Sequence, residues 1–133
     1  MIDTSFYTWL TANVTGGYSV QENKIDFDRV LPWVWYRRSS TIQERLLSGA
    51  MCDNFETTFD VEFVDTNIDN VQTQCDTIKT ALQTITPGSV LGSTFAHAIF
   101  VQEHSDDYIP RTIENSDTGL HLATFQVRIL HRA

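Results

Sequence analysis

The chain has 133 residues, of which 41% are hydrophobic and 20% charged, and its formal net charge is −8. This length fits one domain, residues 1–133, that folds without disulfides or metals. The apolar runs are too short to cross a bilayer, and the acidic balance argues against an open nucleic-acid-binding face, because affinity for a polyanion depends on Lys and Arg. The N-terminus lacks the basic start and apolar stretch of a signal peptide, so we expect the chain to remain in the cytosol where it is made.

The N-terminal third predicts a helix followed by a strand. Apolar residues recur at helical spacing over residues 2–10, and Gly16 and Gly17 provide a stop. Residues 30–36 are rich in aromatic and β-branched side chains, which favours a strand. Pro32 restricts this strand to a sheet edge, or restricts itself to the first position of the strand.

The middle of the chain predicts a long hairpin. Residues 39–56 have two interpretations, a helix that ends at Gly49 or the two arms of a hairpin, and we favour the hairpin. Residues 57–64 alternate cleanly, with Phe59, Val61 and Phe63 on one face, which is typical of a half-buried strand.

A helix and two strands complete the predicted order. An apolar stripe from Ile68 to Ile85 includes Cys75 and predicts a helix that Thr66 and Asn67 cap. Strands are expected at residues 94–102 and 120–131, with an acidic loop over residues 106–117 between them. The order predicts an α+β fold: a single-domain sandwich of a mixed or antiparallel β-sheet with helices packed on one face and a long hairpin.

The sequence predicts no catalytic residue, cofactor site or metal site. His97 and His104 point to opposite faces of one predicted strand, whereas His121 and His131 share a face but lie about 33 Å apart along theirs. Residues 65–70 resemble the start of a calcium loop but lack its glycine and its final glutamate, so we interpret them as a helix cap. Glycine-rich phosphate loops, nucleophile elbows and CxxC motifs are absent from the sequence, which lowers the expectation of an enzyme.

A surface that contacts other proteins is the stronger prediction. Trp, Tyr and Arg are enriched at protein interfaces, and residues 33–38 contain all three types. Arg37 and Arg38 are adjacent and so point to opposite sides of a strand, and we expect one of them to pair with an acidic residue of a neighbouring subunit. The predicted subunit or tube interface comprises Trp33, Trp35, Arg37, Arg38, Ile42, Leu46, Leu47, Met51, Leu120 and Leu122.

Taken together, these elements resemble the tail terminator (tail completion) proteins of long-tailed bacteriophages. The resemblance rests on the N-terminal helix, the Pro-aromatic strand at residues 32–38, Leu47-Ser48-Gly49 in the hairpin, the strand at 57–64, the long helix, and the closing stretch from 106–110 through 119–121 into the last strand. It implies a structural virion protein, not an enzyme, that forms a homo-hexameric ring on the tail tube. It also implies assembly in the host cytoplasm and a final place in the neck of the virion.

The implied partners follow from that role. The ring would end polymerisation of the tail tube protein, contact the head-tail connector or stopper protein, and let genomic DNA pass without specific binding. No cofactor and no membrane are implied. Acidic residues repeated around a ring would let DNA slide without sticking.

Two alternatives remain open at this stage. The chain could be another neck component, such as a head-tail stopper or a tail-tube-like protein. In a different class, it could be a small α+β enzyme or ligand-binding domain with a pocket between helix and sheet near His97, Tyr108 and His121. The mass of the protein in solution distinguishes a ring from such a monomer.

Overall fold

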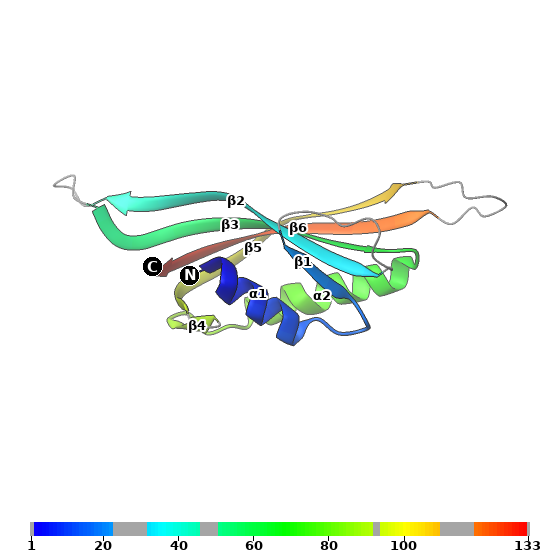
Figure 1. Ribbon diagram of the computed structural model, residues 1–133, viewed down its shortest axis with the longest axis horizontal. Coiled ribbons are helices and arrows are strands. Elements are labelled where there is room, and N and C mark those ends of the chain that lie inside the picture. Colours follow the sequence, from blue (N-terminus) through cyan, green and yellow to red (C-terminus); the bar gives the residue numbers. More distant parts are fainter. Residues whose placement is uncertain (1, 23–31, 46–50, 92–93, 110–118, 133) are drawn as a thin grey trace.

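Figure 1 shows a computed structural model of the chain, which describes residues 2–22, 32–45, 51–91, 94–109 and 119–132. At residues 44–45, 51–53, 103 and 109 the description is limited to the backbone. The elements in chain order are α1 (Ile2–Asn13), β1 (Ser19–Glu22), β2 (Trp33–Arg45), β3 (Met51–Asp65), α2 (Ile68–Gln83), β4 (Ser89–Leu91), β5 (Thr94–Ile109) and β6 (Leu120–Arg132).

The strands form one curled, mixed sheet in the order β1-β2-β3-β6-β5-β4. The pairing of β1 with β2 is parallel, and every other pairing is antiparallel. The expected combination of α-helices with a mixed β-sheet is therefore confirmed. The short strands β1 and β4 were not predicted, and both lie at the edges of the sheet.

The long hairpin is confirmed. β2 and β3 pair from Trp33 opposite Val64 to Arg45 opposite Met51, so the alternative helix over residues 39–56 is wrong for the described part of that segment. Pro32 lies directly before β2 and accepts a backbone hydrogen bond from Ser19 of the β1 segment. This position agrees with the prediction that proline stands at the start of a strand.

At the far end of the sheet, the prediction of an acidic loop needs correction. β5 continues to Ile109, so residues 106–109 belong to a strand that pairs with the start of β6. Backbone hydrogen bonding to β6 outweighs the turn preference of the two aspartates there. The remainder of the predicted loop lies outside the described residues.

α2 follows the sequence prediction closely. The Asn67 side chain caps its first turn by accepting a hydrogen bond from the backbone N–H of Asn70 at 3.1 Å. Val71, Cys75, Ile78 and Leu82 form its buried stripe. Ile68 was expected on the stripe but is exposed, because it stands in the first turn.

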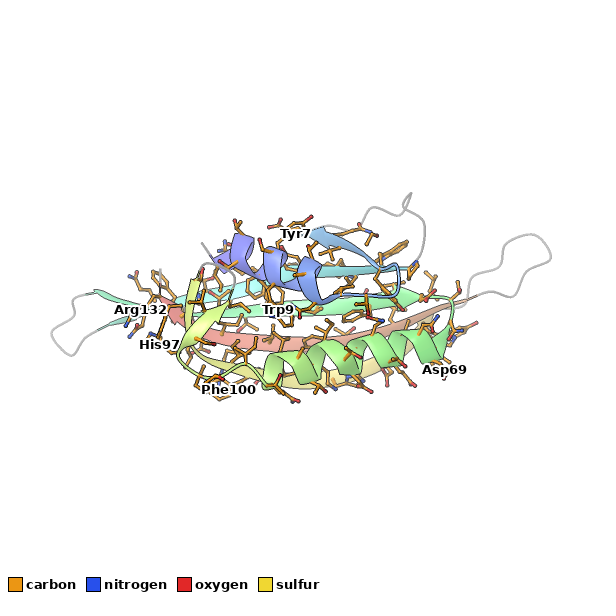
Figure 2. The ribbon with its side chains drawn as sticks, turned by 90° about the horizontal axis from the view of Figure 1, so that it is seen from below. Tyr7, Trp9, Asp69, His97, Phe100 and Arg132 are labelled. Carbon is orange, nitrogen blue, oxygen red and sulfur yellow. The ribbon has the colours of Figure 1, made fainter. Side chains whose placement is uncertain are left out.

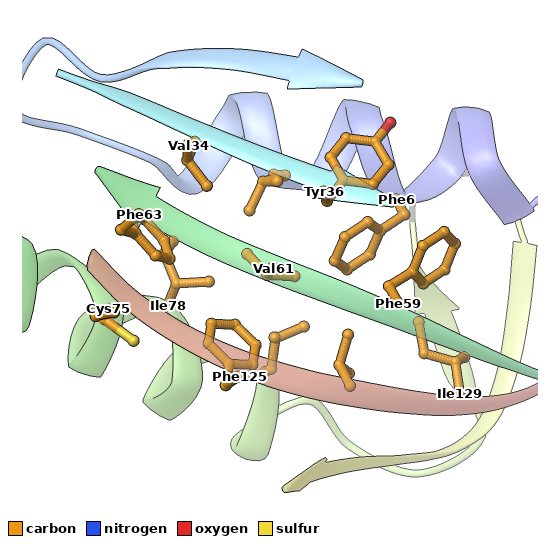
Figure 3. Packing of buried hydrophobic residues seen from close by; sticks show 14 of the residues in the cluster. Phe6, Val34, Tyr36, Phe59, Val61, Phe63, Cys75, Ile78, Phe125 and Ile129 are labelled. Atoms are coloured by element: carbon orange, nitrogen blue, oxygen red, sulfur yellow. The ribbon is translucent and has the colours of Figure 1, made fainter. Parts of the chain in front are cut away.

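The core is one cluster drawn from both helices and from alternate residues of the strands. The ring of Phe6 on α1 stacks on that of Phe59 on β3 with centroids 4.4 Å apart, and Tyr36 of β2 meets both rings edge-on (Figure 3). Ile78 of α2 packs in the same cluster near Phe125 of β6. Among the described residues, neither helix is long and apolar enough to span a membrane.

Candidate assembly interface

Alternate residues of the strands point away from the core cluster, and we call the face of the sheet that they form the outer face. A hydrogen-bonded row crosses this face: Trp35 Nε1 donates to Glu62 Oε1 at 2.8 Å, and Thr124 Oγ1 donates to Glu62 Oε2 at 3.4 Å. The three residues are aligned in register on β2, β3 and β6. The row holds Trp35 in place, half-buried, with part of its ring on the surface.

The two adjacent arginines lie on opposite sides of β2, as predicted. Arg37 extends over the outer face, with its guanidinium 5.9 Å from the centre of the Trp35 ring and 3.4 Å from Asp60 Oδ2. Arg38 points to the other side and pairs with Asp3 of α1 at 3.0 Å. Each arginine therefore has a partner in its own chain, and both pairs are exposed ones of the kind that contributes about 0.2–1 kcal/mol.

A second charged cluster lies further along the outer face. Arg128 of β6 is 3.6 Å from Glu56 of β3, and its guanidinium lies 5.0 Å from the centre of the Phe100 ring on β5. Phe100 is nevertheless 44% exposed. The outer face thus combines paired charges with accessible aromatic rings, a composition typical of protein interfaces.

The predicted interface residues are not gathered in one place. Ile42 is 58% exposed on the arm of the hairpin, whereas Leu120 and Leu122 are partly exposed at the start of β6, at the opposite end of the sheet (Figure 1). Trp33 is only 3% exposed, so it has almost no surface left to offer a partner. Leu46 and Leu47, and the side chain of Met51, lie outside the described residues.

The sheet has two long edges that short strands cover only in part. β1 pairs with residues 33–36 of β2, and no described strand pairs with the same side of residues 37–42, which we call the β2 free edge. β4 pairs with residues 94–96 of β5, and among the described strands none covers residues 97–109, which we call the β5 free edge. These edges are not predictable from the sequence, because they follow from the unequal lengths of neighbouring strands.

His104 of β5 contacts two residues of α2, Cys75 and Lys79, and also Asp106 of its own strand. The Cys75 Sγ atom is 3.7 Å from His104 Nδ1, which also lies 2.9 Å from Lys79 Nζ. A charged lysine can only donate, so Nδ1 accepts and His104 Nε2–H donates to Asp106 Oδ1 at 3.0 Å. This contact cannot be predicted from the sequence, because the cysteine lies on a helix stripe and the histidine on a strand that is distant in the chain.

This arrangement does not make Cys75 a nucleophile. The side chain is fully buried in the core cluster, and burial raises the pKa of its thiol to about 12. Reactive cysteines need a lowered pKa and partial exposure. The cluster is thus best explained as packing between α2 and β5.

The sheet register does not bring together His97, Tyr108 and His121, the residues named for the alternative pocket. Tyr108 and His121 are paired across β5 and β6, with ring centres 4.7 Å apart. His97 lies at the other end of β5, where it hydrogen-bonds to Asn54 at 3.0 Å, and Figure 2 shows it near Arg132. Within the described residues, three or more potential metal ligands are not grouped together anywhere.

His131 is a buried histidine with both ring nitrogens occupied. Its Nδ1–H donates to the Arg132 carbonyl at 2.6 Å, so Nε2 accepts from the Thr57 hydroxyl at 2.8 Å. Burial lowers the pKa of His131 from its ordinary value of 6.5, although the hydrogen bond to the carbonyl acts in the opposite direction. The folded protein therefore holds this ring neutral at pH 7.

We expect this histidine to make the fold less stable in mild acid. The unfolded chain binds the proton at a higher pH than the folded chain, so the free energy of unfolding should fall as the pH drops below about 6.5, by at most about 1.4 kcal/mol per pH unit. Urea unfolding at pH 7.5, 6.5 and 5.5 measures the slope. His131→Gln should flatten it, and a variant slope equal to that of the parent would contradict the assignment.

No protein family model matches the chain, and no curated protein matches it. Its function is therefore argued from its residues and from the geometry of its sheet.

Proposed function

We propose that this protein is a structural component of a phage virion, a tail terminator that caps the tail tube as a hexameric ring. The ring stops further addition of tube subunits and forms the contact to the head-tail connector or stopper protein. In this proposal the chain carries out no catalysis and holds no cofactor. DNA crosses the ring without specific binding, which agrees with a net charge of −8 on every subunit.

The observation that carries the proposal is the pair of long free edges on one small sheet. A monomeric sheet protein normally shortens or covers such edges, because unpaired backbone groups invite association with other chains. Here three of the large exposed hydrophobic residues, Ile42, Phe100 and Tyr108, lie on the free edges. These features favour a protein that works as part of an assembly.

The proposal includes a finer statement of the fold, that both helices pack on one face of the sheet and leave the outer face to partners. It is supported by the core cluster, which combines Phe6 of α1 and Ile78 of α2 with Phe59 and Phe125 of the sheet. It is also supported by the partly exposed Leu122 and Leu130 on the outer side of β6. In the ring, this face would meet a neighbouring subunit or the tube.

The proposal is tested by the mass of the protein and by its place in the virion. Native mass spectrometry should detect a species of six chains of 15.2 kDa each, with a sixfold ring in electron micrographs. A gold-labelled antibody against the chain should bind intact virions at the head-tail junction. A protein that is monomeric at high concentration and also absent from virions would overturn the proposal, and a label spread along the tail would favour a tube-like protein instead.

The hairpin offers a variant for the same experiment. Deleting residues 43–50 removes the tip of the β2–β3 hairpin and none of the core residues of β3, so circular dichroism should show an intact fold. We expect this deletion to abolish attachment to tails. Normal tails from the deletion would show that the hairpin does not contact the tube.

A further inference from the structure

We propose that copies of this chain join head to tail through their sheets, with the β2 free edge of one copy pairing antiparallel with the β5 free edge of the next. The inference rests on the ring proposed above and names the contact that would build it. The partner is a second copy of the same chain.

The directions of the strands suit this contact. β2 and β5 lie on opposite sides of the β3–β6 pair, and the three successive antiparallel pairings from β2 to β5 make these two strands run in opposite directions. A second copy in the same orientation therefore presents its β5 antiparallel to the β2 of the first. Repeating one head-to-tail contact closes a ring when the rotation between copies is right.

Charge selects this pairing over its alternatives. The β2 free edge contains Arg37 and Arg38 and no acidic residue, whereas the β5 free edge contains Glu103, Asp106 and Asp107 and neither Lys nor Arg. Opposite charges across paired strands are favourable and like charges are not. Contacts between two β2 edges or between two β5 edges would place like charges together, so the β2–β5 contact is preferred.

The irregularities within the strands indicate a register. Ser40–Gln43 on β2 and Ala98–Gln102 on β5 are stretches of regular pairing bounded by register shifts. Ile42 is paired in register with Glu56 and Phe100 with Arg128, residues that meet on the outer face, so both exposed apolar side chains lie on the same face of the sheet. Placing Ile42 opposite Phe100 buries both.

The same register brings the charges together. In an antiparallel alignment with Ile42 opposite Phe100, residues 38 and 37 of β2 fall opposite residues 104 and 105 of β5. Asp106 and Asp107 are then diagonal neighbours of Arg38 and Arg37, two residues further along β5, a separation that long side chains can span. One alignment thus places the two apolar side chains opposite each other and the opposite charges within reach at diagonal positions. Because apolar contact and charge favour the same alignment, this register can be tested with substitutions at named positions.

Disulfide cross-linking tests the contact directly. In a Cys52→Ser background, the double variant Ile42→Cys, Phe100→Cys should form covalent multimers of up to six chains on mild oxidation. Side chains opposite each other on antiparallel strands have Cβ atoms about 4.5–5.5 Å apart, close to what a disulfide requires. Each single-cysteine variant should remain largely monomeric on a denaturing gel, because neither cysteine then has a partner.

A matched control uses an exposed residue away from the edges. Ile42→Cys combined with Ile68→Cys on α2 has the same number of surface thiols and should not form the ladder. A ladder from this control equal to that of the test variant would overturn the edge contact. The edge contact would also be overturned if the test variant formed a ring of six chains without any cross-links. That outcome would leave the proposed tail function intact.

A charge exchange separates the head-to-tail contact from a symmetric one. Two double variants reverse the charge of one edge each: Arg37→Glu, Arg38→Glu on β2, and Asp106→Lys, Asp107→Lys on β5. Each should weaken self-association at least about tenfold. The variant with all four substitutions should recover most of the lost self-association. The control is a double variant on α2, Asp69→Lys, Asp76→Lys, which changes the net charge by the same amount as the β5 variant. It should have little effect on self-association. A fourfold variant as weak as its parents would overturn the proposal, whereas full recovery in a protein absent from virions would overturn only the tail function.

Discussion

Replacing Phe59 by alanine should lower the free energy of unfolding by about 3–5 kcal/mol, the range for an aromatic side chain lost from a packed core. The Phe59 ring is fully buried and stacks on Phe6 with centroids 4.4 Å apart. It also packs against Tyr36, with centroids 5.8 Å apart. The substitution leaves a cavity at the place where α1 meets the sheet, so both the transfer free energy and the packing are lost.

Urea unfolding followed by circular dichroism measures this effect. The matched control is Tyr7→Ala, which truncates an aromatic side chain on the exposed side of the same helix and should change stability by no more than about 0.5 kcal/mol. Similar losses in the two variants would mean that α1 is not docked on β3 as described.

Replacing Asp65 by alanine should be the second largest loss, about 1.5–3 kcal/mol, the range for hydrogen bonds to a charged group. One carboxylate oxygen of Asp65 accepts from the Tyr18 hydroxyl at 3.2 Å, and the other accepts from the backbone N–H of Thr66 at 2.7 Å. Both Asp65 and Tyr18 are buried. Alanine would leave a buried hydroxyl and the amide before α2 without this acceptor.

A double-mutant cycle with Tyr18→Phe isolates the side-chain pair. If the two groups interact, the double variant should lose less stability than the sum of the single variants. Strict additivity would show that the hydrogen bond contributes nothing. Burial and the neighbouring Asp65 carboxylate raise the pKa of the Tyr18 hydroxyl, so it remains a donor throughout the accessible pH range.

Much of the fold could be predicted from the sequence because its signals are local. Successive buried residues of α2 are three or four positions apart, and the Asn67 cap directly precedes the helix. The alternation of Phe59, Val61 and Phe63 is visible within five residues. The hairpin was predicted because its arms are adjacent in the chain. In each case the residues that make the pattern are also neighbours in sequence.

The missed features depend on contacts between distant segments. β1 and β4 are short, and what makes them strands is the neighbour that supplies their hydrogen bonds: β1 gains a parallel partner in β2, and β4 lies against the start of β5. The burial of Trp33 likewise depends on tertiary packing, since Trp35 two residues later stays partly exposed. Composition alone does not distinguish these two tryptophans.

The residue types of the candidate interface are predicted from the sequence, but their positions on the sheet are not. The residue types of Ile42 and Arg37 predict that they belong to an interface, and the structure places both on the surface of the β2 arm. Phe100 was not chosen, because the sequence of β5 is apolar on both faces and does not say which side is covered. The free edges appear only when strand lengths are compared across the finished sheet.

The position of β6 in the sheet also bears on how the protein folds during synthesis. β6 lies between β3 and β5 and supplies the central pairings, yet it follows both of them in the chain. Until residues 120–132 have left the ribosome, β3 and β5 have no common partner, and the core-facing side chains of β3 lack Phe125 and Val127. Contacts of such long sequence separation slow folding. The core-facing side chains of β3 would therefore remain uncovered by β6 from the time β3 leaves the ribosome until β6 has followed it. A chaperone that binds extended segments with exposed apolar side chains would find β3 as its target during that interval.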